Sequence, residues 1–267
     1  MFVEELRLIF SRVRNIVILL LLFLVPIILG LVVDTFGAHK GNGQGPPFFS
    51  QITQNSAFLS LTSLVTVQGF LLPMAVAFVA GDSIAGEAQN GSLRYLLVAP
   101  ISRVRLVIIK VSSGIVFGIV ASILIVLSGW IAGLLLFPHG PVVTLSGKLI
   151  SEGKGFELSL LAALAVGLSM VSVVAISTMA STFTESPIAA VAIGLAVAIV
   201  SEILDPIPQL SGIAPLLLSN YWQAFISFFR SPSDFIPFYK ELLSQLCWLL
   251  FGLSGALFNF RNRDILN

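Results

Sequence analysis

Six long apolar segments dominate this chain and leave few residues from which a water-soluble core could be built. Hydrophobic residues fill 57% of the 267 positions and charged residues only 10%, against roughly 25% charged residues in soluble domains. A helix needs about 20 apolar residues to cross the hydrocarbon core of a bilayer. We therefore expect an all-α membrane protein. Its six transmembrane helices are predicted at residues 16–33, 57–80, 104–137, 157–183, 187–204 and 242–260.

These segments leave little chain for an aqueous domain, so we interpret residues 1–267 as a single transmembrane domain. The run that starts near Ile16 has the positive flank of a signal peptide but no small-residue cleavage site, which indicates a retained span. The third segment is longer than a bilayer requires, so it is expected to tilt or to project into water. Residues 205–241 are expected to form an extracytoplasmic loop, whose aromatic residues favour the headgroup region.

The distribution of basic residues predicts the orientation. Positive charges near the ends of spans favour the cytoplasmic side, and six spans place both termini on the same side. One side holds Arg7, Arg12, Arg14, Arg94, Arg103, Arg105, Lys110, Arg261 and Arg263, and the other holds Lys40, Lys148, Lys154, Arg230 and Lys240. We therefore expect both termini, and the loop between the second and third spans, to be cytoplasmic.

Residues 1–15 have the pattern of an amphipathic helix. Their apolar residues fall on one helical stripe, and most of the charged residues lie outside it. A helix of this kind with basic residues on its polar side lies flat at a membrane surface. We predict an elbow helix before the first span and take Arg7, Arg12 and Arg14 as candidate contacts with a cytoplasmic partner. The apolar stripe consists of Phe2, Val3, Leu6, Ile9, Phe10 and Val13.

A compact polar insert, residues 81–103, separates the second and third spans. Asn90-Gly91 is a strong helix-stop and turn signal, and Ser92 can cap a helix beginning at Leu93 by accepting a backbone N–H. Pro100 ends that helix. The pattern predicts two short helices at the cytoplasmic surface, the first presenting Glu87 and the second exposing leucines. A plain loop would need only a few polar residues, so we interpret the insert as a docking surface for another protein.

The residues of this insert resemble the motif of a known family. Glu87 is followed by Gly91-Ser92-Leu93-Arg94-Tyr95-Leu96-Leu97, by Pro100-Ile101-Ser102-Arg103 and by Lys110. This order resembles the glutamate–glycine–small–leucine, proline–x–serine–arginine and lysine pattern of type-2 ABC exporter permeases. The amphipathic start, the six spans and the length agree with that family, so the resemblance covers the whole chain.

The resemblance implies that the insert contains the coupling helix, which sits in a groove of a separate ABC-type ATPase subunit. It also implies a multi-pass protein of the inner or plasma membrane and a second permease subunit, either the same chain or a related one. It implies export of a substrate that the sequence does not define. The contact residues that it implies are Glu87, Gly91, Ser92, Leu93, Arg94, Leu97 and Arg103.

The chain has no phosphate-binding loop of the form G-x-x-x-x-G-K-[ST]. We therefore expect no cofactor on this chain, and ATP and Mg²⁺ would bind the partner ATPase. Membrane lipid is a further expected partner. The net charge of +1 gives no indication of nucleic acid, and we expect none to bind.

Glu202 and Asp205 lie three residues apart at the outer end of the fifth span, so they share a helical face. Ionisable groups inside a membrane are costly and usually mark a pathway or an ion pair. Because Pro206 follows directly, the two carboxylates can also be read as an outer cap at the membrane boundary. Both interpretations, substrate path and outer cap, stay open.

Small and hydroxyl-bearing residues recur in the third and fourth spans. Small residues let helices approach closely, and hydroxyl groups bond across the contact. We predict that they pack helices together, with a dimer seam as the alternative. They are Gly114, Gly118, Ser122 and Gly129 in the third span, and Gly167, Ser169, Ser172, Ser177, Thr178, Ser181 and Thr182 in the fourth.

Two other functional classes stay open. An intramembrane protease would use Ser169, but that chemistry needs a nearby base, and His39 and His139 lie in outer loops. Cys247 is the single cysteine and no H-E-x-x-H motif occurs, so no catalytic residue and no metal site are expected. A channel-like or structural membrane protein would not need a patterned docking insert.

Overall fold

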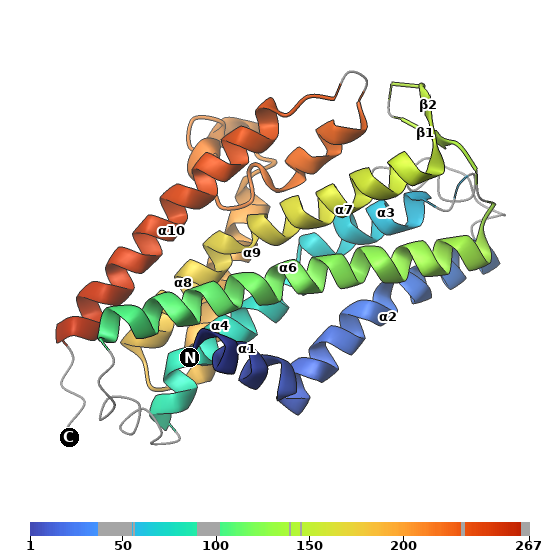
Figure 1. Ribbon diagram of the computed structural model, residues 1–267. Coiled ribbons are helices and arrows are strands. Elements are labelled where there is room, and N and C mark those ends of the chain that lie inside the picture. The colour runs from blue at the N-terminus through green and yellow to red at the C-terminus, as the bar shows by residue number, and fades with distance from the viewer. Residues whose placement is uncertain are drawn as a thin grey trace.

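Long helices that run roughly side by side make up the computed structural model of the chain (Figure 1). The structure describes residues 1–36, 55, 57–89, 102–138, 140–144, 146–230 and 233–262, with side chains as far as residue 259. Within this part, six helical segments are long and apolar enough to cross a membrane. The predicted fold class, an all-α membrane protein, is confirmed.

The helices follow one another with short connections. The α-helices are α1 (Phe2–Ser11), α2 (Val13–Phe36), α3 (Ala57–Gln68), α4 (Leu71–Gln89), α6 (Arg103–Leu136), α7 (Glu152–Ser169), α8 (Val171–Phe183), α9 (Pro187–Leu204) and α10 (Ile236–Asn262). Between α9 and α10 lie three 3₁₀ helices, η3 (Pro208–Leu210), η4 (Ala214–Leu216) and η5 (Trp222–Phe229).

The second and fourth predicted spans are each divided into two helices. A turn at Gly69 and Phe70 separates α3 from α4, and Met170 alone separates α7 from α8. Pro73 explains the first break, because proline lacks the N–H that would bond the carbonyl of Gly69 and its ring would clash with that carbonyl. The helices nevertheless follow one another along the bundle (Figure 1).

Several helices extend beyond the predicted spans. α4 continues past residue 80 to Gln89, so residues 81–89 lengthen this helix and do not form the separate short helix that the sequence predicts. Burial of Asp82 to Glu87 against neighbouring helices holds this extension in place. Residues 90–101, with the second predicted short helix, lie outside the described residues. α7 begins earlier than predicted because Ser151 caps it by accepting a bond from Lys154 N.

The core of the bundle is α8, which packs against α4, α9 and α10. Its hydroxyl residues are buried, and Ser181 Oγ accepts bonds from the backbone N–H groups of Ile84 and Ala85 in α4. A Cβ on Gly194 of α9 would lie 1.9 Å from Ser177 Oγ of α8, so only glycine allows this approach. The small residues of the fourth span therefore pack helices within one chain, as predicted, and are buried too deeply for a dimer seam.

The two ends of the bundle differ. We call the end that carries α1, Gln89 and the start of α6 the α1 end. The opposite end, called the hairpin end, carries the antiparallel strands β1 (Val142–Val143) and β2 (Leu149–Ile150) between α6 and α7. Gly147 in the turn has φ +78°, a conformation that few side chains tolerate.

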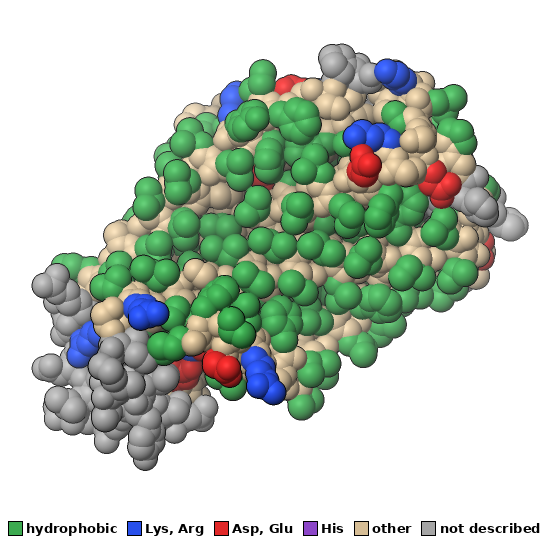
Figure 2. Space-filling view, viewed as in Figure 1, with side chains coloured by type: hydrophobic (Ala, Val, Ile, Leu, Met, Phe, Trp, Pro, Cys, Tyr) green, Lys and Arg blue, Asp and Glu red, His purple; other side chains and the backbone are tan. Residues whose placement is uncertain are grey.

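The surface agrees with a protein that crosses a membrane. Hydrophobic side chains cover the middle of the face in Figure 2, and charged side chains gather towards its two ends. Of the segments that could span, α2, α9 and α10 have only 22% of the residues in an apolar 18-residue stretch buried, against 78% in the corresponding stretch of α7 with α8. Apolar side chains of α2, α9 and α10 therefore face outward, where lipid or a second subunit can cover them.

Candidate functional site

The site at the α1 end begins with the bend between α1 and α2. Arg12 ends α1 with an extended backbone (φ −68°, ψ 122°), and α2 follows at once. The buried side chain of Asn15 donates a hydrogen bond of 2.9 Å from Nδ2 to the carbonyl oxygen of Ile9. The end of a helix leaves such carbonyls without a helical partner. This bond therefore stabilises the bend.

α1 packs on α6 through one side. Ile9 is buried, and the ring of Phe10 lies 6.0 Å from that of Phe117 in α6. Phe2 and Val3 of the predicted apolar stripe are exposed. Exposed apolar residues on a short helix whose other side is packed suit a position in a membrane interface. A short helix followed by a bend thus stands where the sequence predicts an elbow.

Lys110 of α6 is the centre of a buried triad with Glu5 of α1 and Glu87 of α4. Its Nζ donates to Glu5 Oε1 at 2.8 Å and also to Glu87 Oε1. The side chains are 3% exposed for Lys110, 14% for Glu5 and 11% for Glu87. Buried ionic groups are tolerated when they are paired and hydrogen-bonded. The buried triad therefore ties three helices together through one ammonium group.

A second cluster of charges lies nearby and links the bend to α4. Arg12 Nη1 donates to Asp82 Oδ2 at 2.8 Å, and Arg14 Nη1 donates to Asp82 Oδ1 at 3.0 Å. The guanidinium carbon of Arg14 also lies 5.4 Å from the ring centroid of Phe78, within the range of a cation–π contact. The two arginine side chains are about two-fifths exposed, so water screens these pairs more than it screens the buried triad.

These contacts surround the two helix ends that flank residues 90–101. Glu87 lies two residues before the end of α4, and Lys110 lies about two turns into α6. An ion pair between them joins the chain on both sides of the segment, and Glu5 adds α1 to the same group. A force applied to that segment would therefore reach α1, α4 and α6 together.

The structure places the predicted coupling residues in different situations. Glu87 was predicted on an exposed helix, and this is wrong, because Lys110 pairs with it inside the bundle. Arg103 begins α6 and is partly buried. Arg12 and Arg14 pair with Asp82, whereas Arg7 is exposed. The predicted contacts at Gly91, Ser92, Leu93, Arg94 and Leu97 lie outside the described residues.

Sequence reasoning missed the burial or the ion pairs of four ionisable residues, which are Glu5, Asp82, Lys110 and Glu241. Lys110 was part of the family motif but was not expected to bind Glu5, which lies 105 residues away in the sequence. Asp82 was read as part of a surface insert. Glu241 was placed just outside the last span, but α10 begins at Ile236, and Glu241 is 1% exposed with neither carboxyl oxygen bonded among the described residues.

Glu202 and Asp205 lie together beside a polar cavity of about 170 Å³. The cavity lies between the last turn of α9, the break between α3 and α4, and the chain just before η5. The two residues are therefore brought together as their spacing predicts.

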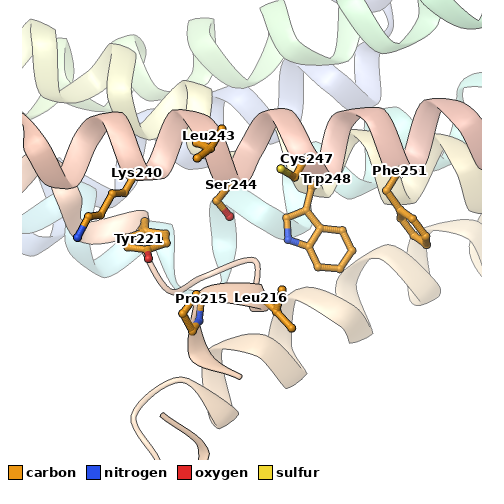
Figure 3. A pocket seen from close by; sticks show the side chains of 9 residues that line it. All are labelled: Pro215, Leu216, Tyr221, Lys240, Leu243, Ser244, Cys247, Trp248 and Phe251. Atoms are coloured by element: carbon orange, nitrogen blue, oxygen red, sulfur yellow. The ribbon is translucent and has the colours of Figure 1, made fainter. Parts of the chain in front are cut away.

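A larger, apolar groove of about 690 Å³ runs along α10. Trp248 and Phe251 of α10 line it on one side, and Leu216 of η4 lies opposite (Figure 3). Lys240 and Tyr221 lie together at one end of the groove (Figure 3). Its size and polarity suit an apolar chain with a polar or anionic group at the lysine end.

The environment of Ser169 does not support nucleophilic chemistry. Its hydroxyl donates to the carbonyl oxygen of Val166 at 2.7 Å and accepts a bond from Gln68 Nε2 at 3.1 Å. A nucleophilic serine needs a base within hydrogen-bond reach, and neither partner can take up a proton at neutral pH. Within the described part of the chain, no group of three or more His, Cys, Asp or Glu could hold a metal ion.

The profile of the ABC-2 family transporter proteins matches residues 43–247. The chain belongs to this family. It is an ABC-2 transporter membrane protein, and the family is a transport family without catalytic activity of its own. The comparison with curated proteins gives no match. The predicted family is thereby confirmed, and with it the prediction of a transmembrane transport permease.

Proposed function

We propose that this ABC-2 protein is the permease subunit of an exporter and that a separate ATPase subunit drives it from the α1 end. The observation that carries the proposal is the buried triad. It joins the two helices that flank residues 90–101, and it joins α1 to both. A surface on which another protein pushes needs such a rigid attachment to the transmembrane helices.

The proposed mechanism follows from that attachment. Two ATPase subunits, which hold ATP and Mg²⁺, would close on one another and displace residues 90–101. Lys110 would pass the movement to α1 and α4 through Glu5 and Glu87. The bundle would then change from open at the α1 end to open at the hairpin end, and substrate would leave there.

A second permease subunit completes the proposed assembly. The outward faces of α2, α9 and α10 are apolar and little buried within the chain, so they offer the surface for another copy or for a related permease. We place the assembly in the inner or plasma membrane. Arg12 and Arg14 at the α1 end agree with a cytoplasmic position for that end and for both termini.

The experiment is co-purification with an ABC ATPase, followed by transport in proteoliposomes. We expect Arg94→Glu to abolish ATPase binding and transport while the permease stays folded in the membrane. Lys154→Glu, at the hairpin end, is the matched charge-reversal control and should leave both unchanged. Normal binding and transport by the Arg94 variant would contradict the coupling role.

A second pair of variants tests the attachment itself. Glu87→Lys should uncouple ATP hydrolysis from transport, because it places two cations inside the bundle. The swap of Glu87→Lys with Lys110→Glu restores one such pair and should regain part of the transport. A permease that never associates with an ATPase but still conducts ions would favour the channel alternative instead.

A further inference from the structure

The polar cavity beside α9 has the composition of a binding site. Glu202 and Asp205 line it from α9, Gln68 and Gly69 from the break between α3 and α4, and Ser219 from the chain before η5. A Cβ on Gly69 would lie 3.7 Å from Glu202 Oε1, so the carboxylate reaches the backbone of the break. Three separate parts of the chain therefore meet around one hollow.

Buried acceptor atoms in this cavity have no hydrogen-bond partner among the described residues. They are Gln68 Oε1, Ser219 Oγ and Asp205 Oδ1. Gln68 is only 2% exposed and Ser219 only 4%. Buried polar groups are paired in the great majority of cases. Trp222, which also lines the cavity, has a donor at Nε1 that is unpartnered within the described part of the chain, so three acceptors stand against one donor, and the excess of acceptors points to a ligand that donates hydrogen bonds.

The orientation of Gln68 is set by its other bonds. Its Nε2 donates to the carbonyl oxygen of Trp222 at 2.7 Å and to Ser169 Oγ at 3.1 Å. The amide nitrogen is thus fully used, which leaves the amide oxygen as the atom available for a ligand.

The charge of the cavity selects a cation. Among its nine lining residues are two carboxylates and no Lys, Arg or His. A hard divalent ion would need six or more oxygen ligands or a nearly complete shell of water, and no suitable group of three acidic, His or Cys residues occurs among the described residues. A cation that carries several N–H donors fits better, because it satisfies separate acceptors and the negative charge together.

The cavity lies towards the hairpin end of the proposed membrane-spanning region, because Glu202 and Asp205 stand at the last turn of α9. Gly69 precedes Asp82 by 13 positions, which corresponds to about 20 Å along a helix. Asp82 binds the arginines at the α1 end, so the cavity lies about 20 Å from these ion pairs, towards the hairpin end. A ligand at that depth would reach it from the hairpin end or from the outer part of the lipid layer.

We propose that this cavity binds a primary ammonium group, held by the carboxylates of Glu202 and Asp205 and by the oxygens of Gln68 and Ser219. The group can belong to a soluble alkylamine or to the headgroup of an aminophospholipid. The proposal concerns the permease alone and needs no ATPase, so its failure would leave the coupling role untouched.

The test measures binding of propylammonium chloride to the purified permease in phosphatidylcholine nanodiscs by isothermal titration calorimetry. We expect propylammonium to bind, and we expect neither 1-propanol nor tetramethylammonium to compete, because one lacks the charge and the other lacks the N–H donors. Glu202→Gln and Asp205→Asn should each weaken binding at least tenfold. Glu157→Gln, whose side chain is 68% exposed, is the matched control and should not.

Further arms distinguish the source of the amine and guard against misfolding. Competition by phosphatidylethanolamine in the nanodisc would assign the site to a lipid headgroup, and its absence would assign it to a soluble amine. Ser219→Ala is small enough to preserve folding and should still weaken binding several-fold. Binding that tetramethylammonium displaces, that survives the double change at Glu202 and Asp205, or that Ca²⁺ displaces at equal concentration would overturn the proposal.

Discussion

Removal of the Lys110 ammonium group is expected to destabilise the protein strongly. Lys110→Met keeps a side chain of similar length but leaves Glu5 and Glu87, two like charges, in a site where neither is more than 14% exposed. Breaking a buried ion pair by removing one partner costs about 3–5 kcal/mol. At 1.4 kcal/mol for each factor of ten, the folded fraction relative to the unfolded should fall by a factor of at least about 100.

The measurement is the free energy of unfolding in mixed micelles, titrated with a denaturing detergent. Lys154→Met is the matched control, because Lys154 also pairs with a glutamate but is 58% exposed. Such a surface pair contributes about 0–1 kcal/mol. The loss in free energy of unfolding should therefore be at least about threefold larger for Lys110→Met than for Lys154→Met.

A double-mutant cycle separates the pair from simple loss of packing. Lys110→Met combined with Glu87→Gln removes one of the uncompensated charges and should be more stable than Lys110→Met alone by more than 1 kcal/mol, of the order measured for coupled neighbours. Two results would refute the reasoning about the buried triad. One is a cost of less than about 1 kcal/mol for Lys110→Met. The other is a cost of the double variant equal to the sum of the costs of Lys110→Met and Glu87→Gln alone.

Three further changes test the packing. Gly194→Ala should cost about 1–3 kcal/mol, because its Cβ would lie 1.9 Å from Ser177 Oγ, and thermal unfolding checks this. Ser181→Ala should cost about 0.5–1.5 kcal/mol, because α4 loses the two hydrogen bonds that join it to α8, whereas Ser113→Ala, which loses only a bond to its own helix, should cost less. Glu241→Met should raise the melting temperature, because it removes two buried oxygens without partners.

Each of these results has a contrary outcome. Equal melting temperatures for Gly194→Ala and the parent would mean that α8 and α9 can separate freely. Equal losses of stability in Ser181→Ala and Ser113→Ala would mean that the hydrogen bonds between α4 and α8 do not stabilise the protein. A lower melting temperature for Glu241→Met would indicate that the carboxyl group has a partner in the assembled protein.

The sequence predicts the spans because hydropathy is a local property that a single chain carries in full. Residues 187–204 form α9 with the predicted bounds. Hydropathy does not predict the breaks within two of the spans, since apolar residues continue on both sides of each break. Pro73 after Gly69 could have revealed the first, but Pro26 lies inside α2 without breaking it, so proline alone does not decide.

The ion pairs at the α1 end could not be predicted from one sequence. Glu5 and Lys110 are far apart along the chain, and their contact depends on the angle at which α1 crosses α6. Glu87 was assigned to the surface because a charged residue in a polar insert is usually solvated. Its buried position follows from tertiary packing, which pairs it with a cation that local patterning does not reveal.

The continuity of α4 has a mechanical consequence. Its 19 residues form a rod of about 28 Å, with one end beside the α1-end ion pairs and the other at the turn of Gly69 and Phe70. If Gln89 moves sideways by about 5 Å, a rod of this length tilts by about 10°. Ser181 would oblige α8 to follow. The turn about which α4 would tilt lies beside Glu202. A displacement of Gln89 at the α1 end would therefore rotate the start of α4 next to the polar cavity.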